Sequence, residues 1–328
     1  MAFSFKYSPS QKTLERILYT LVLISLISAG TAFGQESPPP QLDAAALNEF
    51  LAIAARRVTE YQARFIDITA DEDQKVEEYD LAGKLKRQRR ITSKLIIYQS
   101  QLDPSITAEY RYIHAVDGVP VTKREERLVK FYDRLAKVDS LKKELDRINR
   151  ESSRYDRDYS FSGHTIHQGL TLTEEARPLF QFTDAGREKI NGRNVIVVQY
   201  QQVTPKPDLE FKLSSLPPVL KGAEQRYRGR LWLDAETAQI WREERDVVLQ
   251  KPSWPQPYTF IRWQLEYVNS SFGILTPKKI VIMMNNNGRT LSGDVPLLLL
   301  GGKATFEYSG FHRFEVTPDA KLEPPAKP

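Results

Sequence analysis

The sequence predicts a mainly β, α+β fold, in which an N-terminal helix and one long inserted amphipathic helix cover a large curved antiparallel sheet. Apolar and polar residues alternate along several runs separated by turn residues, which is typical of strands with one buried and one solvated face. Only two segments have the spacing of amphipathic helices, too few to cover a flat sheet of about ten strands. Because strands twist, so large a sheet curves and leaves a concave apolar face.

The N-terminus, residues 1–34, has the layout of a secretory signal peptide. A basic segment precedes an uncharged apolar run, residues 17–33, and small residues follow; the basic residues are Lys6, Lys12 and Arg16. The alternative is an uncleaved membrane anchor, because residues 17–33 are at the short limit for spanning a bilayer. The proline-containing stretch 35–43 is expected to be a linker, so the sequence predicts an exported protein.

Composition excludes several classes of function. The chain has 328 residues and no cysteine, which rules out disulfides, thiolate metal sites, a cysteine nucleophile and a lipidated cysteine. Its net charge is +5, and removal of residues 1–34 with Lys6, Lys12, Arg16 and Glu15 leaves +3. So small a charge gives no indication of nucleic-acid binding.

The first folded segment is expected to be a helix over residues 44–57 followed by strands. Leu47, Phe50, Leu51 and Ala54 recur at helical spacing, and Asp43 is a suitable N-cap. Strand-like runs follow at 61–68, 75–79, 84–99 and 108–116. The basic run 84–90 suggests binding to anionic lipid headgroups, but we favour a solvated strand whose charges prevent edge-to-edge pairing.

Residues 123–186 are expected to be a helical insertion. Apolar residues spaced by threes and fours predict one amphipathic helix over 124–151 that packs on the sheet; they are Leu128, Phe131, Leu135, Val138, Leu141, Leu145 and Ile148. The residues after it, 152–170, are polar and expected to be irregular. The alternative is a helix that binds a partner or a membrane surface.

Residues 187–317 are expected to form an antiparallel meander interrupted by a proline-rich loop at 205–218. We expect a single domain over 44–317 and a disordered tail over 318–328. Eight apolar residues of the meander fall on one face of their strands and are candidates for the wall of a hydrophobic ligand site. These wall residues are Leu231, Leu233, Ile261, Trp263, Leu265, Tyr267, Phe306 and Tyr308.

The sequence contains no pattern typical of catalysis or metal binding. His164 and His167 are three residues apart, but a metal site needs a third ligand, which the surrounding sequence does not supply. Glu243 and Glu244 are neighbours on a strand and point to opposite faces, so they cannot flank one scissile bond. We therefore predict no catalytic residues, no metal and no cofactor.

The order of elements resembles that of the outer-membrane lipoprotein-sorting protein superfamily, periplasmic carriers built on a half-open β-barrel with a helical lid. The resemblance covers roughly residues 44–316. It is carried by the hairpin Gly-Arg-Leu-Trp-Leu-Asp at 229–234 with Ile-Trp-Arg-Glu at 240–243, and by Thr-Pro-Lys-Lys-Ile at 276–280. It implies a half-open barrel, the periplasm of a Gram-negative bacterium, and an acyl-chain or lipid cavity. This chain would be a divergent exported member, longer through the insertion and the proline loop.

Two functions follow from these observations. The first is a non-enzymatic carrier that binds an acyl chain, a lipid or an acylated protein on the concave face. The alternative is an envelope scaffold that binds a protein partner through its long helix and proline loop and has no ligand cavity. A hydrolase is less favoured than either of these functions. In either favoured case we expect no nucleic acid, and membrane contact only transiently or through an uncleaved signal.

Overall fold

The computed structural model describes residues 41–313 except 101, 104, 136, 157–163, 206–219, 221, 286 and 291–295. The expected signal peptide or anchor, most of the linker, the proline loop and the C-terminal tail therefore lie outside the described residues. The residues described from Gln41 onward belong to one compact unit.

The N-terminal helix α2 (Ala44–Arg64) begins at the predicted N-cap, where the Asp43 side chain accepts a hydrogen bond from the Ala46 amide. The helix ends at Arg64, about two turns beyond the predicted end at residue 57, because Val58 and Tyr61 continue its buried stripe. The prediction of a strand from residue 61 is therefore wrong. The helix ends where the Phe65 amide bonds to the Tyr61 carbonyl.

Eleven strands form one antiparallel sheet, in the order β4-β3-β2-β1-β13-β10-β9-β8-β7-β6-β5. The N-terminal strands are β1 (Ile68–Tyr79), β2 (Leu85–Gln99), β3 (Thr107–Val116) and β4 (Val119–Pro120). The central strands are β5 (Phe180–Ile190), β6 (Arg193–Gln202), β7 (Glu224–Asp234), β8 (Ile240–Gln250), β9 (Tyr258–Asn269) and β10 (Leu275–Met284). The last strand, β13 (Gly302–Arg313), pairs with both β10 and β1.

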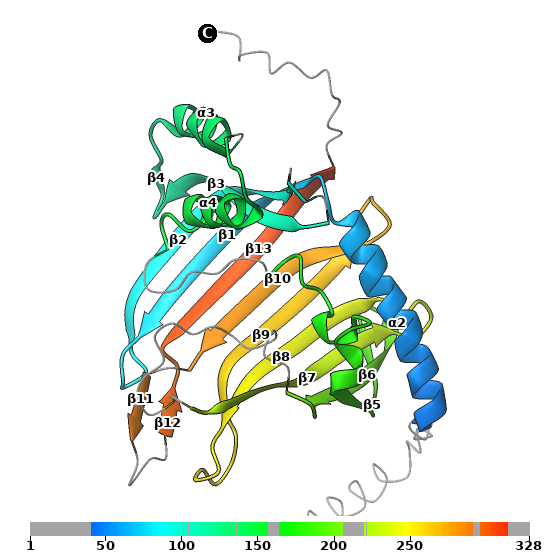
Figure 1. Cartoon of the computed structure of the whole chain (residues 1–328). Coiled ribbons are helices and arrows are strands. Elements are labelled where there is room, and N and C mark those ends of the chain that lie inside the picture. The colour runs from blue at the N-terminus through cyan, green and yellow to red at the C-terminus, as the bar shows by residue number, and fades with distance from the viewer. Residues whose placement is uncertain are drawn as a thin grey trace, which may run out of the picture. The chain divides into compact units, whose positions relative to one another are not determined.

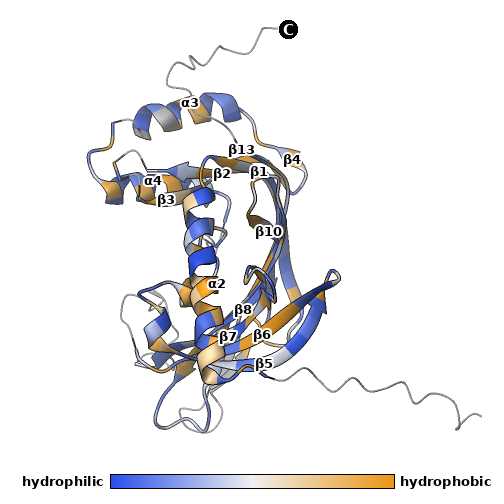
Figure 2. Ribbon diagram, turned by 90° about the vertical axis from the view of Figure 1, so that its right-hand side faces the viewer, coloured by the Kyte–Doolittle hydropathy of each residue, from blue (hydrophilic) through white to orange (hydrophobic). Residues whose placement is uncertain are grey.

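The sheet is open and curved, as the sequence predicts. Its edge strands, β4 and β5, are not paired with each other. Figure 1 shows the strands side by side, and Figure 2 shows α2 lying in the hollow of the curved sheet. A separate small hairpin, β11 (Asn287–Thr290) and β12 (Pro296–Leu299), lies between β10 and β13 in the chain.

The inserted segment forms two helices instead of the single predicted helix. They are α3 (Arg124–Leu135) and α4 (Leu141–Ser152), and Ser140 has the extended backbone of an N-cap residue between them. The stripe of apolar residues is continuous in sequence, but the chain reverses, and both halves of the stripe pack on β3. Ser140 is the local signal for this break, because serine favours helix starts over helix interiors. The end of the segment predicted as an insertion, from Phe180, belongs to β5.

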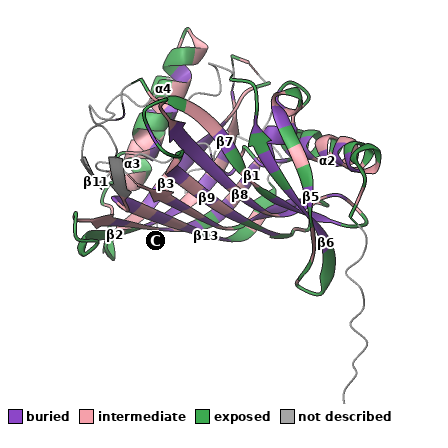
Figure 3. Ribbon diagram, turned by 90° about the horizontal axis from the view of Figure 1, so that it is seen from below, coloured by how far each residue is buried: buried purple, intermediate pink, exposed green. Residues whose placement is uncertain are grey.

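The concave face carries the main core, and the opposite face carries charged residues. Buried residues are concentrated in the strands and exposed residues at the hairpin ends (Figure 3). Ion pairs join neighbouring strands on the outer face, for example Lys94 with Asp71 at 2.6 Å and Arg262 with Asp246 at 2.6 Å. The basic run of β2 is exposed, and β3 pairs with β2 only from Ile91 onward. The run therefore lies along an unpaired strand edge, which supports its predicted protective role.

Membrane-spanning helices were sought among the described residues. In that part of the chain, no helix combines the length and the apolar character needed to cross a bilayer.

Candidate ligand-binding face

The eight predicted wall residues lie together on the concave face. They come from β7, β9 and β13, and all belong to one hydrophobic cluster, with exposed fractions from 0% to 8%. The strand register places them side by side: Leu265 is opposite Ile280, which is opposite Phe306. Sequence alternation thus identified one continuous apolar surface. In this structure α2 and a second segment cover it.

The second covering segment, residues 164–172, is called the strap. It follows α4 in the chain and contains only one short turn of 3-10 helix, Leu170–Leu172. Its Gly169 has a φ of +58°, and a Cβ at this position would lie 2.5 Å from the Ile240 side chain and 2.6 Å from that of Val58. A larger residue would be strained there and would have to displace Val58 or Ile240, because the strap is pressed between α2 and β8.

The strap is fixed to the sheet by a first buried group of charges, the Arg111 cluster, formed by Glu72, Glu109, Arg111 and His164. The Arg111 guanidinium donates to Glu72 at 2.8 Å and to Glu109 at 3.0 Å. From the strap, His164 Nε2 lies 3.3 Å from the Arg111 guanidinium. The Thr165 amide and hydroxyl donate to Glu109 at 2.6 and 2.5 Å. All four charged or titratable side chains are buried.

The cluster shifts the pKa values of its members. Burial would raise the pKa of Glu109, but His164, Arg111 and the Thr165 hydrogen bonds favour its carboxylate and lower that pKa to about 2. Burial lowers the pKa of His164 to about 4, although Glu109 opposes this shift. His164 is therefore neutral and Glu109 ionised at neutral pH.

A second buried group of charges, the Arg245 cluster, holds the other end of the strap. Arg245 donates to Glu243 at 2.8 and 2.5 Å, and also to the carbonyl oxygen of His167 at 2.9 Å. The Gly169 amide donates to Glu243 at 3.0 Å. The Arg245 pKa is raised: burial lowers it, but the Glu243 carboxylate outweighs this effect. Both clusters bind backbone groups of the strap, and the Arg111 cluster also binds the side chains of His164 and Thr165.

Sequence analysis did not identify either cluster. Charged residues in strands are normally read as solvent-facing, yet Glu109 and Arg111, like Glu243 and Arg245, point inward. The available signal was the spacing: opposite charges two residues apart on a face that otherwise carries apolar residues. Such a pair indicates a buried ion pair on one side of a strand.

The interior has no arrangement typical of catalysis in its described part. The inward carboxylates are each bound to an arginine, and His164 faces a guanidinium and the Tyr308 hydroxyl, which lies 3.3 Å away. Among the described residues, no group of three or more His, Cys, Asp or Glu side chains is placed to hold a metal ion. His164 belongs to the Arg111 cluster, whereas the carbonyl oxygen of His167 accepts a hydrogen bond from Arg245 of the second cluster.

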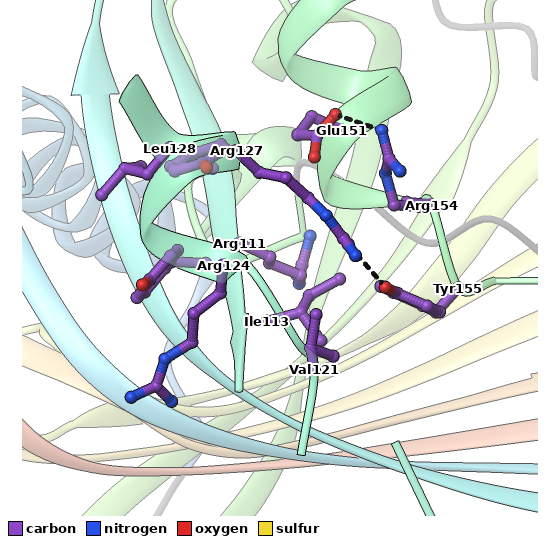
Figure 4. Close-up of a pocket in the computed structure, with 11 residues that line it drawn as sticks. Arg111, Ile113, Val121, Arg124, Arg127, Leu128, Glu151, Arg154 and Tyr155 are labelled. Carbon is purple, nitrogen blue, oxygen red and sulfur yellow. Dashed lines mark hydrogen bonds and ion pairs between the residues drawn. The ribbon is translucent and has the colours of Figure 1, made fainter. Parts of the chain in front are cut away.

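Two cavities lie away from the concave face. A cleft of about 20 Å³ between β3, α3 and the end of α4 is lined by arginines, and Arg127 donates to the Tyr155 hydroxyl at 2.8 Å (Figure 4). It has room for about one water molecule. A groove of about 710 Å³ on the outer face is lined by opposite charges, including the Lys279–Glu307 pair. Neither of these two cavities has a lining that matches an apolar ligand.

No protein-family model matches the sequence, and no curated protein matches it. Solved structures do match. A DUF1329 family protein from Desulfovibrio piger is 11% identical with a TM-score of 0.36, and the match covers 84% of this chain and 96% of that chain. An outer membrane lipoprotein-sorting protein domain from Vibrio parahaemolyticus is 10% identical with a TM-score of 0.38, covering 83% and 95%.

Two further structures match at lower TM-scores. A LolA superfamily protein from Nitrosomonas europaea is 7% identical with a TM-score of 0.33, covering 80% of this chain and 94% of that chain. MucB in complex with MucA(peri) is 10% identical with a TM-score of 0.20, covering 79% and 93%. The superfamily that the sequence resembles is therefore among the solved structures that match. These identities and TM-scores carry no argument about function, which depends on the geometry described above.

Proposed function

We propose that this protein is a non-enzymatic carrier that binds an acyl chain or another hydrophobic ligand on its concave face. The structure then corresponds to a closed conformation, with the strap and α2 lying over the wall residues. The carrier would act outside the cytoplasm, in the periplasm of a Gram-negative bacterium, as the pattern of residues 1–34 suggests. The alternative location is the inner membrane, with residues 17–33 as an uncleaved anchor.

One observation supports this proposal above the others: buried charged groups of the sheet hold residues 164–169 of the strap over an apolar wall. A permanently filled core is usually closed by apolar side chains, and replacing buried ion pairs by apolar groups is often neutral or stabilising. Here residues 164–169 of the strap are bound through Glu109, Glu243 and Arg245, and Ile166 and the fully buried Leu172 add apolar contacts to the core. Such contacts with charged groups can be exchanged for water, so residues 164–169 are the separable part of the cover.

The seam between α2 and the strap is the proposed route to the wall. A crevice of about 10 Å³ lies along it, lined by residues that include Val58, Tyr61, Gln168 and Ile240. The Tyr61 hydroxyl donates to the Thr165 carbonyl at 2.6 Å and closes the seam at one point. Opening the seam would place the ligand directly over Leu265 and Tyr267.

The first test is native mass spectrometry of the protein purified from a periplasmic extract, with lipid extraction of the material that co-purifies. A lipid or acylated protein at one copy per chain is expected. A bare mass, together with no uptake of added phospholipid or of a palmitoyl-chain fluorescent probe, contradicts the carrier proposal and favours the scaffold alternative. Cross-linking to a protein partner would then be the next measurement.

The second test locks the seam. A Cβ on Gly169 would lie 3.8 Å from the Val58 Cβ, the usual separation in a disulfide, and the chain has no cysteine of its own. The variant Val58→Cys with Gly169→Cys should lose uptake of the palmitoyl probe when oxidised and regain it when reduced. The reduced form is the matched control for the two substitutions. Equal uptake in both forms would show that the ligand does not enter between α2 and the strap.

A further inference from the structure

The end of the sheet formed by the β1–β2 turn is a second surface with a defined chemistry. The turn residues 80–84 project beyond the last paired residues, Tyr79 and Leu85. Leu81 and Leu85 each have 45% of their surface exposed. The neighbouring residues Lys84 and Lys86 are also exposed, so apolar and basic groups occur together at one tip.

The tip has a fixed conformation. The Asp80 carboxylate accepts hydrogen bonds from the amides of Ala82 and Lys84, both at 2.9 Å. The Asp80 amide donates to the Lys84 carbonyl at 3.0 Å, and Gly83 supplies the positive φ of +76° that this turn requires. These hydrogen bonds fix the Asp80 side chain within the turn.

A second hairpin leaves the same end of the sheet. The Tyr79 amide donates to the Gly301 carbonyl at 3.0 Å, and the Gly301 amide donates to the Met284 carbonyl at 2.8 Å. The hairpin β11–β12 therefore starts and ends beside the β1–β2 turn, as Figure 1 shows. Its return strand lies in the sequence Pro-Leu-Leu-Leu-Leu, residues 296–300. The two hairpins therefore leave the sheet side by side.

We propose that this end of the sheet docks on the surface of a lipid bilayer that contains anionic phospholipids. Leucine side chains gain free energy by entering the boundary between headgroups and acyl chains, and nearby lysines are attracted to anionic headgroups. An acidic protein surface would match the lysines, but it would leave the two exposed leucines unexplained. The edge-protecting role of the basic run of β2 is compatible with this docking. The proposal does not depend on ligand binding at the concave face.

The test uses the full chain and exploits its lack of cysteine. A single cysteine at the tip, Leu85→Cys, carries an environment-sensitive fluorophore, and a label at Leu102→Cys is the matched control, because Leu102 is 48% exposed. With phosphatidylcholine vesicles containing about a third phosphatidylglycerol, the tip label should shift to the blue and be quenched by nitroxide-bearing lipid. The label at 102 should not change. Because the readout is local, binding through the N-terminus does not produce it.

Charge reversal gives a second, independent readout. Lys84→Glu with Lys86→Glu should lower partition of the labelled tip into anionic vesicles about 30-fold or more, since each lysine near such a surface contributes about a factor of five. Lys137→Glu with Lys142→Glu, which changes two exposed lysines elsewhere, should leave partition within about twofold. A tip label that stays hydrated on bound vesicles overturns the proposal, as does unchanged partition after charge reversal at the tip.

Discussion

The two faces of β3 hold their partners in different ways. On one face, Tyr110 stacks on Phe131 of α3 with ring centres 4.5 Å apart, and Ile148 of α4 is fully buried beside them. On the other face, Glu109 and Arg111 hold the strap through charge and hydrogen bonds. On the same strand, Tyr110 therefore forms an apolar attachment for the helices, and its neighbours Glu109 and Arg111 form a polar attachment for the strap.

The difference shows how one strand can carry a fixed element and a releasable one. Apolar contacts are non-directional, and breaking them exposes aromatic surface to water. The polar contacts of the strap are directional, and water can replace each of them. The division is not absolute, because Glu144 of α4 also accepts hydrogen bonds from the hydroxyls of Tyr98 and Ser100. We therefore expect the helical pair to stay in place under conditions that release the strap.

The largest effect should come from removing the central cation of the polar attachment. Arg111→Met leaves Glu72 and Glu109 buried without their counter-charge, and should lower the free energy of unfolding by about 3–5 kcal/mol in urea denaturation. The triple variant that adds Glu72→Gln and Glu109→Gln should recover most of this loss, since no buried charge remains. A triple variant as unstable as Arg111→Met would mean that charge is not the cause.

Breaking the apolar attachment should lower the free energy of unfolding slightly less, and it should loosen the helices instead of the strap. Phe131→Ala removes the ring stacked on Tyr110 and should cost about 3 kcal/mol. Amide hydrogen exchange should accelerate in α3 and α4 but stay unchanged in the strap. Val129→Ala is the control, because Val129 is 61% exposed and should change stability by less than about 0.5 kcal/mol. Faster exchange in the strap of Phe131→Ala would refute the independence of the two faces.

Acid should loosen the polar face selectively. The pKa of His164 is lowered from 6.5 to about 4, so the unfolded chain binds more protons between these values and stability falls as pH decreases through them. The loss should approach roughly 3 kcal/mol near pH 4. Glu109, whose pKa is about 2, adds a further loss below about pH 4.5. Protonation of His164 and Glu109 therefore takes nothing from the free energy of unfolding above about pH 6.5.

This pH dependence can be assigned with one substitution. Urea denaturation of His164→Asn at pH 7 and at pH 4.5 should show a smaller difference between the two values than the unsubstituted chain, because the neutral side chain cannot take up a proton. At pH 4.5 the amide protection factors should fall more in the strap than in α3 and α4. If the stability of both proteins changed equally with pH, protonation of His164 would not be the cause of the change.

The smallest effect concerns the fit of the strap against α2. Gly169→Ala places a Cβ against Val58 and Ile240 at a positive φ, and should destabilise the protein by about 1–2 kcal/mol. Adding Val58→Ala opens space on the α2 side. It should recover the part of the stability loss that comes from the clash with Val58, but not the part that comes from the positive φ. Thermal denaturation of the single and double variants measures both. No recovery would place the clash on Ile240 instead.

Much of the fold could be predicted because alternation and helical spacing are local properties. The inward set Leu231, Leu233, Trp263 and Leu265 was identified from strand periodicity alone, and the structure places these residues on one face. The helix break at Ser140 was missed because the apolar stripe continues across it. The strap was expected only as an irregular region, since its position depends on contacts such as Thr165 with Glu109, which no local pattern encodes.

The pairing of β1 with β13 joins residues from opposite ends of the described chain, such as Asp73 and Glu307, in the middle of the sheet. Contacts so distant in sequence slow folding, because a long loop must close before they form. The strands on either side can assemble as two smaller sheets while the chain is being completed. The last strand, β13, then joins these two smaller sheets. Proteolytic loss of β13 would separate strands β1–β4 from strands β5–β10, whereas loss of β4 would only remove an edge strand.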